Sequence, residues 1–235
     1  MARIAVDIDS TLYDFETPAR EAFTKLADQT GDKDYLRGAY HPWTEWRSPA
    51  DACGLEAWLE AIDLCHTEEI ILAQTPFNGA VETCQALADE GHELIYISNR
   101  AVESGEATHK WLAENNFPLD KSIVEAEEWH AGHVLKVLTG DKQPFLRDCQ
   151  YLIDDRPKTA IDFLYDVRWQ SMYGPMHDDE TNPGYKRRVF MIAYPYNQAL
   201  TDIPHLYLAP TWAGLNQYLV GKGVLSKPAY HALGV

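Results

Sequence analysis

The chain has 235 residues, 46% of them hydrophobic and 24% charged, a balance typical of a globular protein with a substantial core. Its net charge of −16 argues against a nucleic-acid polymer as the main partner, because polymer binding requires a basic face that neutralises phosphates. No apolar stretch reaches the roughly 18 residues of a membrane span, so we expect no membrane partner. The four cysteines lack CxxC spacing and predict reduced thiols in a cytoplasmic protein.

An apolar strand opens the chain and is followed by helical patterns. The strand ends in two acids, Asp7 and Asp9. The helical patterns cover residues 16–28, ending near Gly31, and residues 55–72, with a stretch rich in aromatic residues and proline over residues 36–53 between them. Because no strand pattern occurs between residues 16 and 75, we predict that this segment is a helical cap inserted after the first strand.

Strand and helix patterns alternate through the rest of the chain. The predicted strands cover residues 93–98, either 122–126 or 134–139, 151–153, 189–194 and 205–208. The predicted helices cover residues 78–90, with Asn78 as the cap, 106–115 and 211–220. Such alternation predicts a mostly parallel sheet covered by helices on both sides. We therefore expect an α/β fold with a Rossmann-like core built from residues 1–15 and 76–235, and a cap over residues 16–75.

Acidic side chains end two of the predicted strands. Asp7 and Asp9 follow the first strand, and Asp154 and Asp155 follow the strand over residues 151–153. Because ligands bind at the carboxyl ends of parallel strands, we expect these acids to meet at one edge of the sheet. Four carboxylates repel one another unless a proton or a divalent cation lies among them, and oxygen ligands favour Mg²⁺. Two adjacent carboxylates also suit a division between an ionised nucleophile and a protonated general acid.

These residues carry a resemblance to a known family. The run Asp7-Ile8-Asp9-Ser10-Thr11 resembles the first motif (DxDxT) of the haloacid dehalogenase (HAD) superfamily of phosphohydrolases. Ser98, at the end of a strand, fits the second motif, and residues 152–157 around Asp154 fit the fourth.

A closer resemblance is to the 5'(3')-deoxyribonucleotidase family, cytosolic type C. It is carried by residues 14–15, 76–80, 138–142, 153–157, 194–197 and Trp212. The chain departs from the nucleotidase pattern at Ser10, where glycine is usual, and in the run Ser98-Asn99-Arg100.

The resemblance implies a Mg²⁺-dependent reaction in which Asp7 attacks phosphorus to form an aspartyl-phosphate. Asp9 would protonate the leaving oxygen and then activate a water. The implied phosphate-binding residues are Ser98, Asn99 and Lys142. The implied metal ligands are Asp7, the main-chain carbonyl of Asp9, Asp155 and, through a water, Asp154.

The phosphate-binding lysine and the substrate-binding residues are open to alternatives. Lys142 suits the phosphate-binding role if residues 134–138 form a strand, whereas Lys136 suits it if they form a helix, and the spacing of Lys142 to Asp154 favours Lys142. A nucleotide base requires a flat stacking surface. The candidates for substrate binding are Phe15, Trp43, Trp46 and Arg100. Trp58 is assigned to the core.

Together these patterns predict a phosphomonoesterase that hydrolyses nucleoside monophosphates, with deoxy forms preferred. An alternative keeps the chemistry and takes a sugar phosphate or another small phosphorylated metabolite as the substrate. A third alternative is a non-catalytic nucleotide-binding protein of the same fold, against which the complete set of acids argues. The sequence does not determine the oligomeric state, and a homodimer is one of the states that it allows.

Overall fold

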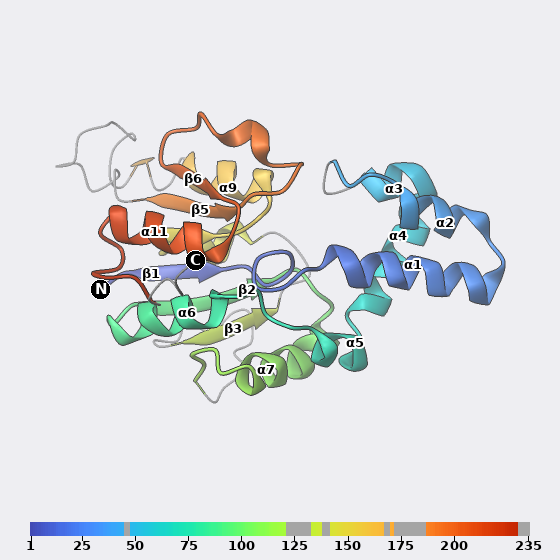
Figure 1. Ribbon diagram of the computed structural model, residues 1–235, viewed down its shortest axis with the longest axis horizontal. Coiled ribbons are helices and arrows are strands. Elements are labelled where there is room, and N and C mark those ends of the chain that lie inside the picture. The colour runs from blue at the N-terminus through green and yellow to red at the C-terminus, as the bar shows by residue number, and fades with distance from the viewer. Residues whose placement is uncertain (45–47, 121–132, 138–141, 167–169, 172–186, 230–235) are drawn as a thin grey trace, which may run out of the picture.

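A six-stranded sheet forms the centre of the molecule in the computed structural model, which describes residues 1–44, 48–120, 133–137, 142–166, 170–171 and 187–229 (Figure 1). The strands are β1 (Arg3–Val6), β2 (Glu93–Ser98), β3 (Val134–Val137), β4 (Tyr151–Ile153), β5 (Arg188–Ile192) and β6 (Leu206–Ala209). Their order is β3-β2-β1-β4-β5-β6, and every neighbouring pair is parallel. The predicted α/β fold with a Rossmann-like parallel sheet is confirmed.

Helices cover both faces of this sheet. They are α6 (Ala80–Asp89), α7 (Gly105–Glu114), α8 (Gln143–Leu146), α9 (Pro157–Leu164) and α11 (Trp212–Gly221), with short 3₁₀ turns η1 (Val102–Ser104) and η3 (Gln198–Leu200). Ile4 and Val6 of β1 pack in one apolar cluster with α6, α7 and α11, whereas Ala5 packs in a second cluster with α8 and α9. The register pairs Ile4 with Leu94 and Ala5 with Ile95, so neighbouring strands share this alternation.

Between β1 and α6 the described residues form five helices. They are α1 (Glu16–Thr30), α2 (Lys33–Tyr40), α3 (Ser48–Cys53), α4 (Leu55–Cys65) and α5 (Glu68–Ala73). The first four lie together beyond the carboxyl end of β1, as Figure 1 shows. Helix α1 ends at Gly31, whose φ of 73° is the left-handed conformation that glycine adopts readily. The described residues between β1 and α6 thus form helices and turns, and the predicted helical insertion after the first strand is confirmed for them.

Three features of the helices differ from the sequence-based expectation. The aromatic-rich stretch over residues 36–53 contributes to α2 and α3, which its turn-forming residues conceal. The predicted helix over residues 55–72 is two helices, because Thr67 adopts an extended backbone (φ −70°, ψ 150°) before α5. Helix α6 begins after Gly79, whose φ is 88°, rather than at an Asn78 cap.

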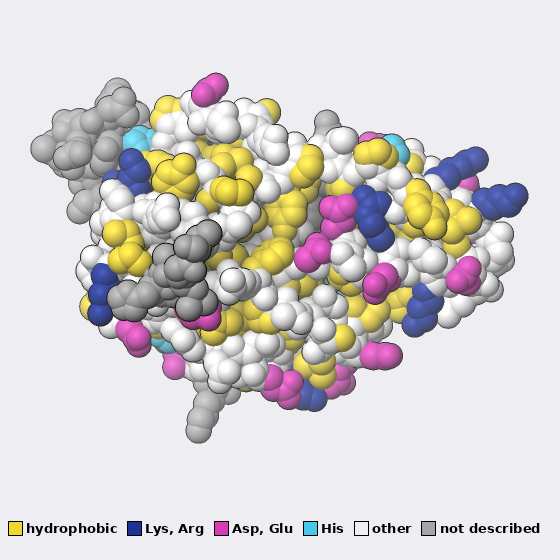
Figure 2. Space-filling model, viewed as in Figure 1, with side chains coloured by type: hydrophobic (Ala, Val, Ile, Leu, Met, Phe, Trp, Pro, Cys, Tyr) yellow, Lys and Arg dark blue, Asp and Glu magenta, His cyan; other side chains and the backbone are white. Residues whose placement is uncertain are grey.

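The remaining strand alternatives are resolved in part. Of the two candidates for the third strand, residues 134–137 form β3, and residues 122–126 lie outside the described residues. Among the helices of the described chain, none combines the length and the apolar character needed to cross a membrane. On the face that Figure 2 shows, acidic side chains are spread over the cap and the sheet region, with Lys and Arg side chains set among them.

Candidate active site

The two acidic strand ends meet at the carboxyl edge of the sheet. Strands β1 and β4 are neighbours, and the main-chain N–H of Asp7 donates to the carbonyl of Ile153 at 2.8 Å. This bond continues the parallel pairing by one residue and sets Asp7 beside Asp154. Carboxylate oxygens of Asp7, Asp154 and Asp155 all lie within 4.8 Å of one another, and all three side chains are buried.

A tight turn follows β1. Ser10 adopts a φ of 58°, a left-handed conformation that glycine reaches without strain and that is uncommon for other residues. The N–H groups of Thr11 and Leu12 donate to the carbonyl of Ile8, and the Trp212 indole donates to the carbonyl of Thr11 at 2.8 Å. The left-handed backbone explains why glycine is usual at this position in the nucleotidase pattern, and in this chain a serine adopts the same conformation.

Lys142 is the lysine at the acidic edge. Its Nζ lies 2.6 Å from Oδ1 of Asp7 and 3.3 Å from Oδ2 of Asp154. Burial lowers the pKa of Lys142, but Asp154 and Asp7 together raise it above its usual value. Lys136 instead lies in β3 with its Nζ 5.0 Å from the centre of the Phe145 ring. Residues 134–137 form a strand, which is the condition under which the sequence favours Lys142 over Lys136.

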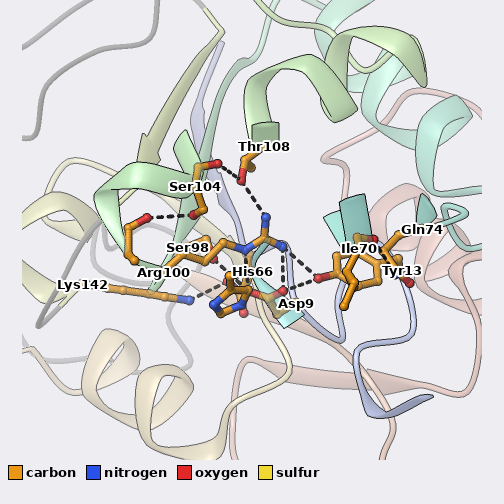
Figure 3. Close-up of polar contacts among 12 residues, drawn as sticks. Asp9, Tyr13, His66, Ile70, Gln74, Ser98, Arg100, Ser104, Thr108 and Lys142 are labelled. Carbon is orange, nitrogen blue, oxygen red and sulfur yellow. Dashed lines mark hydrogen bonds and ion pairs between the residues drawn. The ribbon is translucent and has the colours of Figure 1, made fainter. Parts of the chain in front are cut away.

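Asp9 forms a buried network with residues after β2 (Figure 3). Arg100 donates to both carboxylate oxygens, at 3.0 Å through Nε and 2.6 Å through Nη2. Ser98 donates to Oδ2 at 2.9 Å, and Tyr13 donates to Oδ1 at 2.5 Å. Arg100 also donates to Thr108, so its guanidinium is held from both sides. Ser98 and Arg100 therefore contact Asp9, although the sequence assigned them to phosphate and substrate.

The pKa values of Asp7 and Asp9 are shifted in opposite directions by their surroundings. Burial raises the pKa of Asp9, yet the Arg100 guanidinium holds it well below its usual range. Burial raises the pKa of Asp7 to about 6, with Asp154 and Asp9 adding to the rise and Lys142 opposing it. The reason is that Arg100 neutralises Asp9, whereas Asp7 shares its edge with two further acids.

The three grouped acids fit a hard divalent cation. Oδ1 of Asp155 is buried and has no hydrogen-bond partner among the described residues, while Oδ2 accepts from the Tyr196 hydroxyl. Burial, with Asp7 and Asp154 nearby, raises the pKa of Asp155 well above its usual value, which a bound cation would reverse. Both oxygens of Asp154 already accept hydrogen bonds, from the N–H of Arg156 and from Lys142. This matches a direct ligand at Asp155 and a water-mediated one at Asp154.

A cleft of about 180 Å³ opens over Asp7 and Asp9. Its lining residues come from both the core and the cap helices: Asp7, Asp9, Phe15, Trp58, Ile62, His66, Asn99, Lys142 and Arg156. The cap therefore supplies an apolar wall opposite the charged edge of the sheet.

The predicted substrate-binding residues divide into three groups. Phe15 lines the cleft, and its ring stacks on His66 with centroids 5.6 Å apart. Trp43 packs edge-to-face against Phe15 and Trp58 and stands behind the lining residues. Trp46 lies outside the described residues. Asn99, predicted to bind phosphate, is exposed and lines the cleft.

Sequence reasoning missed several residues of the site. His66, at the end of α4, places its Nε2 3.7 Å from Oδ2 of Asp9, and no motif marks it. Trp58 is buried in the apolar core, as predicted, and its part in lining the cleft is what the sequence did not show. The hydroxyl of Tyr13 donates to Asp9, and that of Tyr196 donates to Asp155. In the sequence, only the nearness of these tyrosines to the matched motifs could have indicated a role in the site.

Comparisons with known proteins agree with this geometry. No family model matches the chain. A protein of Bacillus cereus named "Putative nucleotidase" is 29% identical over 161 residues, which cover 66% of this chain and 77% of that protein. A protein of the same name from Oceanobacillus iheyensis is 29% identical over 171 residues, or 70% of this chain and 81% of that one.

Two solved structures share the fold. A HAD family hydrolase from Deinococcus radiodurans, with bound phosphate and sodium, has a TM-score of 0.55 at 14% identity and covers 96% of this chain and 98% of its own. A haloacid dehalogenase-like hydrolase from Streptococcus pneumoniae has a TM-score of 0.53 at 15% identity, covering 88% of this chain and 93% of its own. The chain thus has the fold of these HAD hydrolases, as its motifs predict, and a sequence similar to two proteins named "Putative nucleotidase".

Proposed function

We propose that this protein is a Mg²⁺-dependent phosphomonoesterase that hydrolyses nucleoside monophosphates, deoxy forms included, through an aspartyl-phosphate. The observation that carries the proposal is the placement of Asp7. Its carboxylate lies 2.6 Å from the Lys142 ammonium and beside Asp154 and Asp155, a group that fits one divalent cation. A nucleophile between two positive charges can approach an anionic phosphoryl group without net repulsion.

The reaction has two steps. An oxygen of Asp7 attacks phosphorus, and the bond from phosphorus to the ester oxygen breaks. Asp9, which is ionised beside Arg100, takes up a proton from solvent as the substrate binds and gives it to that ester oxygen. Asp9 then takes a proton from a water, whose oxygen attacks phosphorus and releases Asp7 and inorganic phosphate. Lys142 and Asn99 contact the transferring group, and Arg100 orients Asp9. Mg²⁺, held by Asp7, Asp155 and the Asp9 carbonyl, would neutralise charge on the phosphoryl oxygens.

The cap side of the cleft supports a nucleoside as the leaving group. Phe15, Trp58 and Ile62 form an apolar wall that faces the acids and suits a flat base. The two nucleotidase relatives point in the same direction. We also propose that residues 16–75 act as a cap on a core of residues 1–15 and 76–235, and that the protein works in the cytoplasm.

A second candidate substrate is a sugar phosphate or another small phosphorylated metabolite. The size of the cleft favours it, because about 180 Å³ is less than the roughly 300 Å³ at which sites for drug-sized ligands begin. A whole nucleotide therefore requires the cap wall to move outward, whereas a small metabolite does not.

The test is release of inorganic phosphate from a panel of ribo- and deoxyribonucleoside monophosphates and sugar phosphates, with and without Mg²⁺. Turnover of nucleotides that disappears in Asp7→Asn supports the proposal. Turnover of sugar phosphates alone would favour the second candidate. A folded protein that turns over no member of the panel would leave the non-catalytic nucleotide-binding alternative.

A further inference from the structure

The two carboxylate oxygens of Asp155 have different surroundings. Oδ2 accepts a hydrogen bond from the hydroxyl of Tyr196, whereas Oδ1 is buried and has no hydrogen-bond partner within the part of the chain that the structure describes. Asp155 itself is fully buried at the end of β4. A buried carboxylate oxygen without a donor is costly unless a cation occupies that side. Oδ2 of Asp155 is thus bound by a side chain of the protein, and Oδ1 is left available to a cation.

Tyr196 is held by the loop that follows β5. The side-chain amide of Asn197 donates to the main-chain carbonyls of Asp155, at 3.0 Å, and Ile192, at 2.9 Å. Its carbonyl oxygen accepts from the N–H of Tyr194 at 2.8 Å. Asn197 is fully buried, and the first of these bonds ties the loop to the backbone of Asp155 while the other two hold the loop against the end of β5. The distance between the tyrosine hydroxyl and the carboxylate is thus fixed by the fold.

The ring of Tyr196 has a second support. It stacks on the ring of Tyr194 with centroids 5.2 Å apart and planes within 3°. The side chain of Ser10, in the tight turn after β1, lies near both tyrosine hydroxyls and opposes the rise that burial causes in their pKa values. The loop after β5 therefore lies close both to the turn that carries Asp9 and to the strand end that carries Asp155.

We propose that Tyr196 is a positioning residue for the cation site: by donating to Oδ2 of Asp155 it turns Oδ1 toward the place that Asp7 and Asp154 share. This inference rests on the cation site of the proposed function and adds a residue outside the ligand set. A hydrogen bond to the second oxygen stops the carboxylate from rotating, so less freedom is lost when the cation binds. Without it, Asp155 would populate orientations that do not face the other two acids.

The test compares two variants of the same stacked pair. Tyr196→Phe removes the hydroxyl that donates to Asp155 and keeps the ring. Tyr194→Phe removes the neighbouring hydroxyl and leaves the bond between Tyr196 and Asp155 in place. Substrate-free protein is titrated with Mg²⁺, and the half-saturating metal concentration is obtained by fitting the dependence of the melting temperature on the logarithm of the metal concentration. We expect Tyr196→Phe to raise this concentration about tenfold or more, and Tyr194→Phe to leave it near the wild-type value.

Turnover gives an independent reading. A positioning role predicts that kcat of Tyr196→Phe returns close to wild type at saturating Mg²⁺, while a merely structural role would lower it at every concentration. An unchanged half-saturating concentration in Tyr196→Phe, with a clear metal response in the wild type, would overturn the inference and leave the proposed function intact. If the wild-type protein itself shows no response to Mg²⁺, the cation site of the proposed function fails, and the inference fails with it.

Discussion

The ammonium of Lys142 lies 2.6 Å from the carboxylate of Asp7, although 135 positions separate the two residues in the chain. The contact joins the end of β1 to the turn that begins α8. This contact distinguishes Lys142 from Lys136, because both lysines are buried and Lys136 lies over the Phe145 ring instead. Which lysine reaches the acidic edge is thus a property of the tertiary structure.

Replacing Lys142 should impair turnover far more than replacing Lys136. Lys142→Met removes a positive charge beside the nucleophile, and loss of one such preorganised group typically lowers kcat by about 100- to 1000-fold. Lys136→Met, a matched control, removes a buried ammonium that lies over the Phe145 ring. Steady-state kinetics on the best substrate of the panel measure both. Equal losses of kcat in the two variants would contradict a role for Lys142 in the reaction.

The pair between Arg100 and Asp9 should contribute strongly to stability. Arg100→Met leaves the buried Asp9 carboxylate without its two guanidinium bonds, and breaking a buried pair in this way costs about 3–5 kcal/mol. Arg37→Met breaks an exposed pair with Asp34 and should cost less than about 1 kcal/mol. Urea unfolding gives both free energies. Similar values for the two variants would mean that Arg100 does not stabilise Asp9.

His66 should affect substrate binding more than the chemical step. It lines the cleft from the cap, so we expect it to contact the substrate equally before and during reaction. His66→Asn should then raise KM about tenfold, as expected for loss of one hydrogen bond worth about 1–1.5 kcal/mol, and leave kcat nearly unchanged. His41→Asn, at the end of α2, is the control within the cap. A fall in kcat with constant KM would instead give His66 a role in the transition state.

The left-handed turn at Ser10 should tolerate glycine and reject a β-branched residue. Ser10→Val places a branched side chain at a φ of 58°, where it is strained, and should destabilise the protein by about 1–3 kcal/mol. Ser10→Gly accepts this backbone and should stay folded with the metal response intact. Thermal unfolding of both variants measures the difference. A Ser10→Val variant as stable as wild type would show that the turn adopts another conformation in solution.

Much of the fold could be predicted from local patterns. The strand over residues 93–98 is apolar throughout and lies between helical patterns, which indicates a buried parallel strand. The same apolar pattern predicts β4, a strand of three residues that Asp154 and Asp155 follow directly. The break between α4 and α5 could not be predicted, because apolar residues at helical spacing continue across it.

The sequence alone determined the parallel sheet, the helical insertion and the four acids at strand ends, since strand polarity carries every carboxyl end of a parallel sheet to one edge. Only the tertiary structure decided how those acids are surrounded. Arg100 pairs with Asp9, Lys142 pairs with Asp7, and Tyr196 holds one oxygen of Asp155. These partners come from distant segments, and the ionisation of a buried carboxylate depends on the charges and donors within a few ångströms rather than on its neighbours in the chain.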